Sequence, residues 1–131
     1  MPWPGGHVEC IALATDRAIA DKFAALQEVM TYIQRAGADI EAAREAGGES
    51  MQLIVEMIRR HIPAHNPSAI VASLDASLRV INYQQLNIDK AGLKQIMNYA
   101  IKAGLLTQEV DVDSFADTRF DVLENNKNNA Q

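Results

Sequence analysis

The sequence has little of several residue types, and each shortage excludes a class of protein. It holds one cysteine, Cys10, so a disulfide within the chain is excluded. Aromatic residues make up 5% of the chain, which leaves alanine, isoleucine, leucine and methionine to build the core and favours helices over a β-sandwich. No apolar run reaches the roughly 20 residues of a membrane-spanning helix. No basic region followed by an apolar stretch opens the chain, so as written it is expected to stay in the cytoplasm.

Positive charge is also in short supply. The chain has 12 Lys and Arg against 17 Asp and Glu, for a net charge of −5. A protein that holds a phosphate backbone needs a basic face, so nucleic acid is excluded as a partner. The hydrophobic fraction of 48% and the charged fraction of 22% are those of a globular chain, and 131 residues correspond to one domain or less.

Motifs that carry enzyme chemistry are missing as well. Gly5 and Gly6 precede a strand-like stretch, whereas a phosphate-binding loop needs a helix there and the pattern GxxxxGK[ST]. His61 and His65 have the four-residue spacing of a metal-binding pair, but Pro63 between them is expected to end the helix that would present both rings. We therefore expect no catalytic residue, no metal site and no cofactor.

The acidic stretch from Asp111 to Asp113 has the composition of part of a calcium loop. It lacks the later glycine and the bidentate glutamate that such a loop requires. Asp113 is therefore expected to cap a short helical turn, with Phe115 and Phe120 as its apolar anchors.

Helical periodicity dominates what is present. Helices are expected at 15–19, from Asp21 to an interruption at Gly37, and at 39–46, 50–62, 67–78 and 90–103. Residues typical of helix termini flank these segments: Thr15 or Asp16, Asn66 with Pro67, and Asp89 at the starts, and Gly47 with Gly48 and Gly104 at the ends.

A short strand is expected at 7–14, where "HVECIALAT" alternates weakly between polar and apolar residues. Cys10 would then be a small buried residue on one strand face, since a nucleophilic role with His7 needs an orienting group that the sequence does not identify. One strand cannot satisfy its own backbone, and only "LRVINY" at 78–83 offers a partner. The chain is therefore expected either to associate with itself or to be the last part of a larger α/β protein.

The C-terminal third carries a recognisable pattern. Residues 87–120, "NIDKAGLKQIMNYAIKAGLLTQEVDVDSFADTRF", comprise a helix, a "GLL" turn, an acidic "DVD" stretch and a terminal Asp-x-x-Phe. This order resembles the C-terminal signature of the substrate-binding proteins of ABC importers, of the nitrate, sulfonate, taurine and thiamine-precursor type. Upstream, "GHVECIALAT", "DKFAALQEVMTYIQRA" and "ADIEAAREAGG" are similar to the strand and helices that precede that signature in the family.

The resemblance implies a fold and a division of the chain. Family members have two α/β lobes of the periplasmic-binding-protein type II fold, are more than twice this length and carry a signal peptide. This chain would then be mostly α with one or two short strands. It would form a single C-terminal partial lobe at 1–124, with a strand at about 7–14 followed by helices, and a polar tail at 125–131.

The resemblance also implies a function outside the cytoplasmic membrane. The chain would be part of a non-enzymatic component that binds a small anionic or heteroaromatic solute between two lobes and docks on an ABC permease. Trp3 and His7 would lie near the ligand, although a tight connector with Trp3 packed and His7 on the surface accounts for the same residues.

Two alternatives stay open. The chain could be a free-standing helical interaction module that binds no ligand, whose exposed strand and broad apolar stripes require a homodimer or another partner. It could also be a small enzyme that uses His7, Cys10 or the pair His61 and His65.

Overall fold

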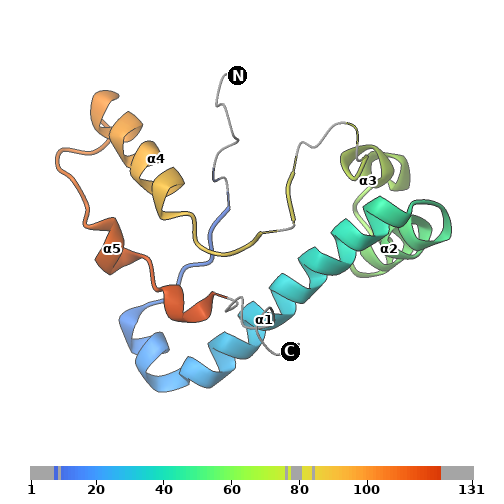
Figure 1. Ribbon diagram of the computed structural model, residues 1–131, viewed down its shortest axis with the longest axis horizontal. Helices are drawn as coiled ribbons and strands as arrows, with labels where there is room; N and C mark the ends of the chain where they lie inside the picture. The colour runs from blue at the N-terminus through green and yellow to red at the C-terminus, as the bar shows by residue number, and fades with distance from the viewer. Residues whose placement is uncertain (1–7, 9, 76, 78–80, 84, 122–131) are drawn as a thin grey trace, which may run out of the picture. The chain divides into compact units, whose positions relative to one another are not determined.

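The computed structural model describes residues 8, 10–75, 77, 81–83 and 85–121, and these residues contain helices but no β-strand (Figure 1). The helices are α1 (Asp16–Ala46), α2 (Gly48–His61), α3 (Pro67–Ser73), α4 (Lys90–Lys102), α5 (Val112–Phe115) and the 3₁₀-helix η1 (Thr118–Phe120). The prediction of a mostly α-helical chain is confirmed.

The chain divides into two compact units. Unit 1 combines Met1–Glu28 with Asn87–Gln131, and unit 2 is Val29–Leu86. Helix α1 contributes to both units, α2 and α3 belong to unit 2, and α4, α5 and η1 belong to unit 1. The predicted boundary between a body at 1–124 and a tail at 125–131 lies outside the described residues.

Helix α1 begins at the side-chain cap that the sequence predicted. The hydroxyl of Thr15 accepts a hydrogen bond from the Ala18 backbone N–H at 3.1 Å, which satisfies one of the free amides of the first turn. Lys22 has non-helical dihedrals, with φ −136° and ψ 28°, so α1 is kinked there. This kink falls next to Asp21, where a new helix was predicted to start.

The predicted interruption at Gly37 is wrong, because α1 continues through it to Ala46. Gly37 is buried, and a Cβ placed on it would lie 2.6 Å from the Tyr83 carbonyl oxygen and 2.7 Å from Cδ1 of Leu86. The glycine is therefore a site of close approach, where the segment carrying Tyr83 and Leu86 packs directly on the helix backbone.

Gly37→Ala is expected to lower the free energy of unfolding by about 1–2 kcal/mol, because overpacking against a backbone carbonyl outweighs the gain in helix propensity of about 1 kcal/mol. Urea denaturation followed by circular dichroism measures the change. Asp39→Ala, at an exposed position of the same helix, is the control and is expected to stay within about 0.5 kcal/mol of the wild type. A Gly37→Ala protein more stable than the wild type would contradict the close approach.

The termini of α2 and the start of α3 lie close to the positions predicted from the sequence. Helix α2 starts at Gly48, two residues before the predicted Ser50, directly after Gly47 with φ 63°. It ends before Pro63, as predicted. The side chain of Asn66 accepts a hydrogen bond from the Ser68 backbone N–H at 2.9 Å, which confirms the predicted cap of α3.

The core of unit 2 lies between α2 and α3. Three buried apolar residues form its centre: Val55, Ile70 and Leu74. Partly buried residues pack against them: Ile40, Met51, Ile54, Ile58 and Tyr83. The spacing of the apolar residues at 50–62 predicts an inward face made by Met51, Ile54, Met57, Ile58 and Ile62. The structure confirms Met51, Ile54 and Ile58 on that face, whereas Met57 and Ile62 are exposed, so the prediction is wrong for those two.

The strands predicted at 7–14 and within 78–83 do not form among the described residues of these segments. Backbone groups of the second segment are bound to side chains of α1 instead. The Tyr83 N–H donates to Oε1 of Glu41 at 2.9 Å, and the Ile81 carbonyl accepts from Nη1 of Arg44 at 3.0 Å. A strand ladder would need those same groups, so these bonds take the place of strand pairing.

Unit 1 is organised by α4 and the segment that follows it. The N–H of Gly104, with φ 72°, donates to the Ile101 carbonyl, and the N–H of Leu105 donates to the Ala100 carbonyl at 2.8 Å. Together these bonds make a Schellman motif, which confirms Gly104 as the residue that ends α4.

Aromatic packing joins the two parts of unit 1. The rings of Phe23 and Phe120 lie 4.8 Å apart, centroid to centroid, and the guanidinium of Arg119 lies 5.0 Å from the Phe23 ring centroid. Phe120 is thus confirmed as an anchor of the C-terminal segment. Phe115 is 55% exposed, so its predicted anchoring role is wrong.

Candidate functional site

The sequence-predicted ligand residues, Trp3 and His7, lie outside the described residues, and their proposed contact with a solute stays a prediction. The described part of the chain offers three other features that could carry function. They are a carboxylate–lysine network in unit 1, a buried arginine in unit 2, and a set of exposed apolar side chains.

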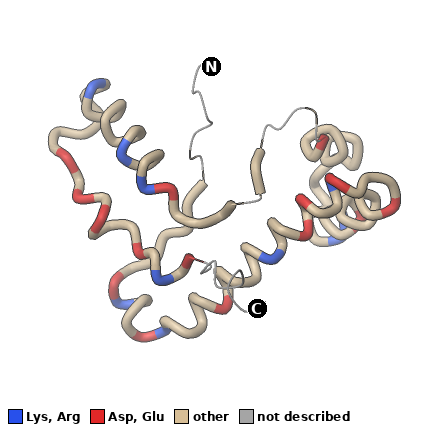
Figure 2. The backbone as a smooth tube through the Cα atoms, viewed as in Figure 1, with Lys and Arg blue, Asp and Glu red and all other residues tan. Residues whose placement is uncertain are grey.

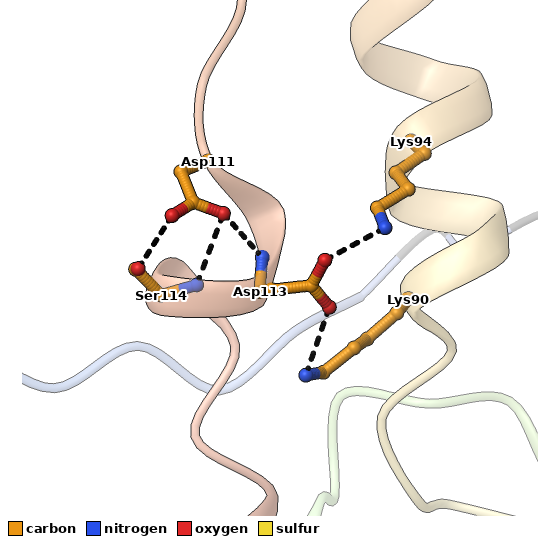
Figure 3. A network of polar contacts seen from close by, with 5 residues as sticks. All are labelled: Lys90, Lys94, Asp111, Asp113 and Ser114. Carbon is orange, nitrogen blue, oxygen red and sulfur yellow. Dashed lines mark hydrogen bonds and ion pairs between the residues drawn. The ribbon is translucent and has the colours of Figure 1, made fainter.

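The carboxylate–lysine network lies where α5 meets α4 (Figure 3). Asp113 accepts from the Lys90 ammonium at 3.1 Å through Oδ1 and from the Lys94 ammonium at 2.9 Å through Oδ2. Asp111 caps α5 by accepting from the backbone N–H groups of Asp113 and Ser114, and the Ser114 hydroxyl donates to its second oxygen at 2.6 Å. The prediction that Asp113 is the cap is therefore wrong by two residues.

These bonds hold the carboxylates in their charged form. The hydrogen bond from the Ser114 hydroxyl is the main cause that lowers the pKa of Asp111, and the hydrogen bond from Lys94 is the main cause that lowers the pKa of Asp113. The same contact raises the pKa of Lys94. Acidic residues recur along the segment after α4, with lysines on α4 (Figure 2). Both oxygens of Asp111 and of Asp113 already have donors, so the network is a clasp between α4 and α5 rather than a site for acid–base chemistry.

Asp113→Asn is expected to destabilise unit 1 at pH 7 and to have a smaller effect near pH 2. A carboxylate whose pKa is lowered in the folded state stabilises the protein at pH values above its ordinary pKa of 3.8. This stabilisation is lost as the pH falls through the folded-state pKa. Urea midpoints at the two pH values measure this. Glu109→Gln removes a nearby charge that forms no hydrogen bond or ion pair with another described residue, and it serves as the control. Equal destabilisation by Asp113→Asn at both pH values would contradict the clasp.

Arg44 is the most buried charged residue in the described part of the chain, with its side chain 4% exposed. Its Nε donates to the Leu74 carbonyl at 3.0 Å, and Nη2 donates to the Asp75 carbonyl at 3.3 Å. Its Nη1 donates to Glu41 at 2.9 Å and also to the Ile81 carbonyl. The guanidinium thus bonds the end of α3 and the segment that follows to α1. Sequence reasoning missed it, because a single arginine on a helix has no motif.

The other residues considered for chemistry do not come together. His61 is the last residue of α2 and His65 lies beyond the turn at Pro63, with both exposed. Cys10 is exposed, so the prediction of a buried cysteine is wrong. Within the described residues, no three His, Cys, Asp or Glu side chains are placed to hold a metal ion, and no buried side-chain polar atom lacks a hydrogen-bond partner.

Exposed apolar side chains are the remaining candidate. In unit 2 they are Val29, Tyr32, Ile33, Leu53, Met57, Ile62, Val71 and Ile81. In unit 1 they are Ile11, Leu13, Tyr99, Leu105, Val110 and Phe115. By contrast, the buried apolar residues of the described chain are few and mostly small: Ala43, Val55, Ile70, Leu74, Val112 and Ala116. Such surfaces can bind another polypeptide, since large exposed apolar patches mark interaction sites.

Comparison with protein-family models, curated proteins and solved structures finds no match to this chain. None of the described helices has the length and apolar character needed to cross a membrane.

Proposed function

We propose that the chain is the C-terminal part of the solute-binding component of an ABC-type importer, for a small anionic or heteroaromatic solute. The observation that supports the proposal is the way segment 87–120 folds. Each element of its resemblance to that family has a structural role: Gly104 ends α4, Asp111 caps α5, Asp117 caps η1, and Phe120 packs on Phe23. Segment 87–120 is thus a folded unit that packs, through Phe120, on Phe23 of α1.

In this function the helices are scaffold. The solute binds between two lobes, the closed form gains contacts with it, and that closed form docks on the membrane permease. Trp3 would contribute a stacking face and His7 a ring nitrogen to the ligand. Asp111 and Asp113 take no part, because their oxygens are bound by Ser114, Lys90 and Lys94. The working location would be outside the cytoplasmic membrane.

The test begins with the genomic DNA on the 5′ side of the Met1 codon. We expect an in-frame segment with two-lobe features, and the continuous product is then titrated calorimetrically with nitrate, taurine, an alkylsulfonate and a phosphorylated pyrimidine. One saturable site is expected, weakened at least tenfold by Trp3→Ala or His7→Ala, with the exposed His65→Ala as the control. An unrelated upstream sequence together with no heat from any solute would overturn the proposal.

A second candidate is a helical interaction module that associates through its apolar faces and binds no solute. The excess of exposed over buried large apolar residues favours it, because a chain of this size is marginally stable unless such surface is covered. Amide hydrogen exchange at rising protein concentration tests it. Slower exchange in α1 or α2 at high concentration supports association, and identical exchange at all concentrations opposes it.

A further inference from the structure

Helix α2 carries two opposed faces. One face, with Met51, Ile54, Val55 and Ile58, packs into the core of unit 2. The other presents Leu53, 66% exposed, and Met57, 55% exposed, which lie one turn apart. An exposed leucine alone needs no explanation, but two large apolar residues on one line of a helix have the spacing of anchor residues in helix-mediated contacts.

Charged residues continue this line at both ends. Glu49 lies one turn before Leu53 and Arg60 lies just under one turn after Met57, so both lie within about 40° of Leu53 around the helix axis. No hydrogen bond or ion pair joins either of them to another described residue, unlike Lys90, Lys94 and Arg119 of unit 1. The strip Glu49, Leu53, Met57, Arg60 therefore reads acid, apolar, apolar, base along α2 and has its charged ends free.

We propose that this strip is a homodimer contact in which α2 of one chain packs antiparallel on α2 of a second copy. Reversal of the strip gives its own complement: Leu53 meets Met57 of the second copy, and Glu49 meets Arg60 of the second copy. With the two-fold axis midway between Leu53 and Met57, Glu49 lies about 9 Å from the axis and Arg60 about 7.5 Å, at 1.5 Å per residue. The two long side chains span that difference with ease, so both ion pairs form at once.

A second copy fits this strip better than an unrelated partner, because the charge order is complementary to itself. The contact is small, which places it among weak, salt-sensitive associations. It specifies the partner of the interaction module considered above and does not depend on solute binding. The same charges also suit the helix dipole of α2, with the acid in the first turn and the bases in the last, so the test must separate the two effects.

Sedimentation equilibrium of the full chain, at increasing concentration and two salt levels, supplies that test. Glu49→Arg and Arg60→Glu are each expected to weaken self-association about tenfold, because like charges then face each other in both pairs. Mixed one to one, the two variants are expected to associate as tightly as the wild type, since opposite charges again face each other at both ends of the strip when a Glu49→Arg chain pairs with an Arg60→Glu chain. The helix dipole predicts no such rescue.

Arg59→Glu is the matched control. It makes the same charge change in the same exposed last turn of α2, but at about 120° from Leu53 around the helix, and is expected to leave association unchanged. The proposal is overturned if the wild type stays monomeric at every concentration, if the mixture is no tighter than its components, or if Arg59→Glu weakens association equally. Concentration-dependent hydrogen exchange without charge rescue would leave the interaction module standing on another face and remove this one.

Discussion

Arg44→Ala is expected to lower the free energy of unfolding by about 3 kcal/mol, the largest effect of any single polar substitution in the described chain. The change removes one guanidinium and leaves the carbonyls of Leu74, Asp75 and Ile81 without their donor. It also leaves Glu41 without its cation. Urea denaturation followed at the helical circular dichroism band measures the loss.

Two further variants define the cause. Arg44→Lys keeps the charge but offers a point donor in place of a planar fork, so it is expected to recover only part of the loss. Arg35→Ala changes an exposed arginine of the same helix and is expected to stay within about 0.5 kcal/mol of the wild type. Full recovery by lysine would mean that charge alone, rather than the three carbonyl bonds, accounts for the stability.

Leu74→Ala is expected to cost about 3 kcal/mol as well, through a different cause. Leu74 is 2% exposed and forms the centre of the unit 2 core with Val55 and Ile70. Its truncation removes apolar contact and leaves a cavity, and losses of this kind range over about 2–5 kcal/mol. The urea midpoint measures the cost.

Val71→Ala is the matched control for the core. It lies on the same short helix α3 and is 51% exposed, so we expect a loss below about 1 kcal/mol. Similar losses of stability from Val71→Ala and Leu74→Ala would contradict the assignment of Leu74 as the centre of the unit 2 core.

Local features of the fold could be predicted from the sequence, because their causes are local. Thr15, Asn66 and Asp89 cap helices through oxygens that reach amides two or three residues away, and Gly104 ends one through its positive φ. Each of these needs only its neighbours in the chain. The helix starts predicted from these caps therefore agree with the structure. The predicted stop at Gly37 and the predicted end of the third helix at residue 78 do not, since α1 continues to Ala46 and α3 ends at Ser73.

Features set by distant residues could not be predicted. Gly37 resembles a helix breaker in sequence, yet the approach of Tyr83, 46 positions on, makes it a buried residue inside a continuous helix. Asp113 was assigned as a cap because nothing in the sequence places Lys94 beside it. The segment around Ile81 has the alternation of a strand, but the side chains of α1 take its backbone groups.

The side chains of α2 that stay exposed could not be predicted either, for a related reason. Exposure is a property of packing, and the apolar stripe of α2 could be read from its spacing without showing which residues the core would leave out. Leu53 and Met57 belong to that stripe and are exposed. The spacing of Glu49 and Arg60 around Leu53 and Met57 indicates a contact surface only once the exposure of Leu53 and Met57 is known.

The division of the chain has a consequence for biosynthesis. Unit 2 is continuous, and the bonds of Arg44 close within 37 residues, so it can fold as soon as it leaves the ribosome. Unit 1 must wait, because Phe23 packs on Phe120 and the residues between them must first be made. The order of synthesis therefore sets an order of folding, in which unit 2 folds first and unit 1 folds once its C-terminal helices have been made.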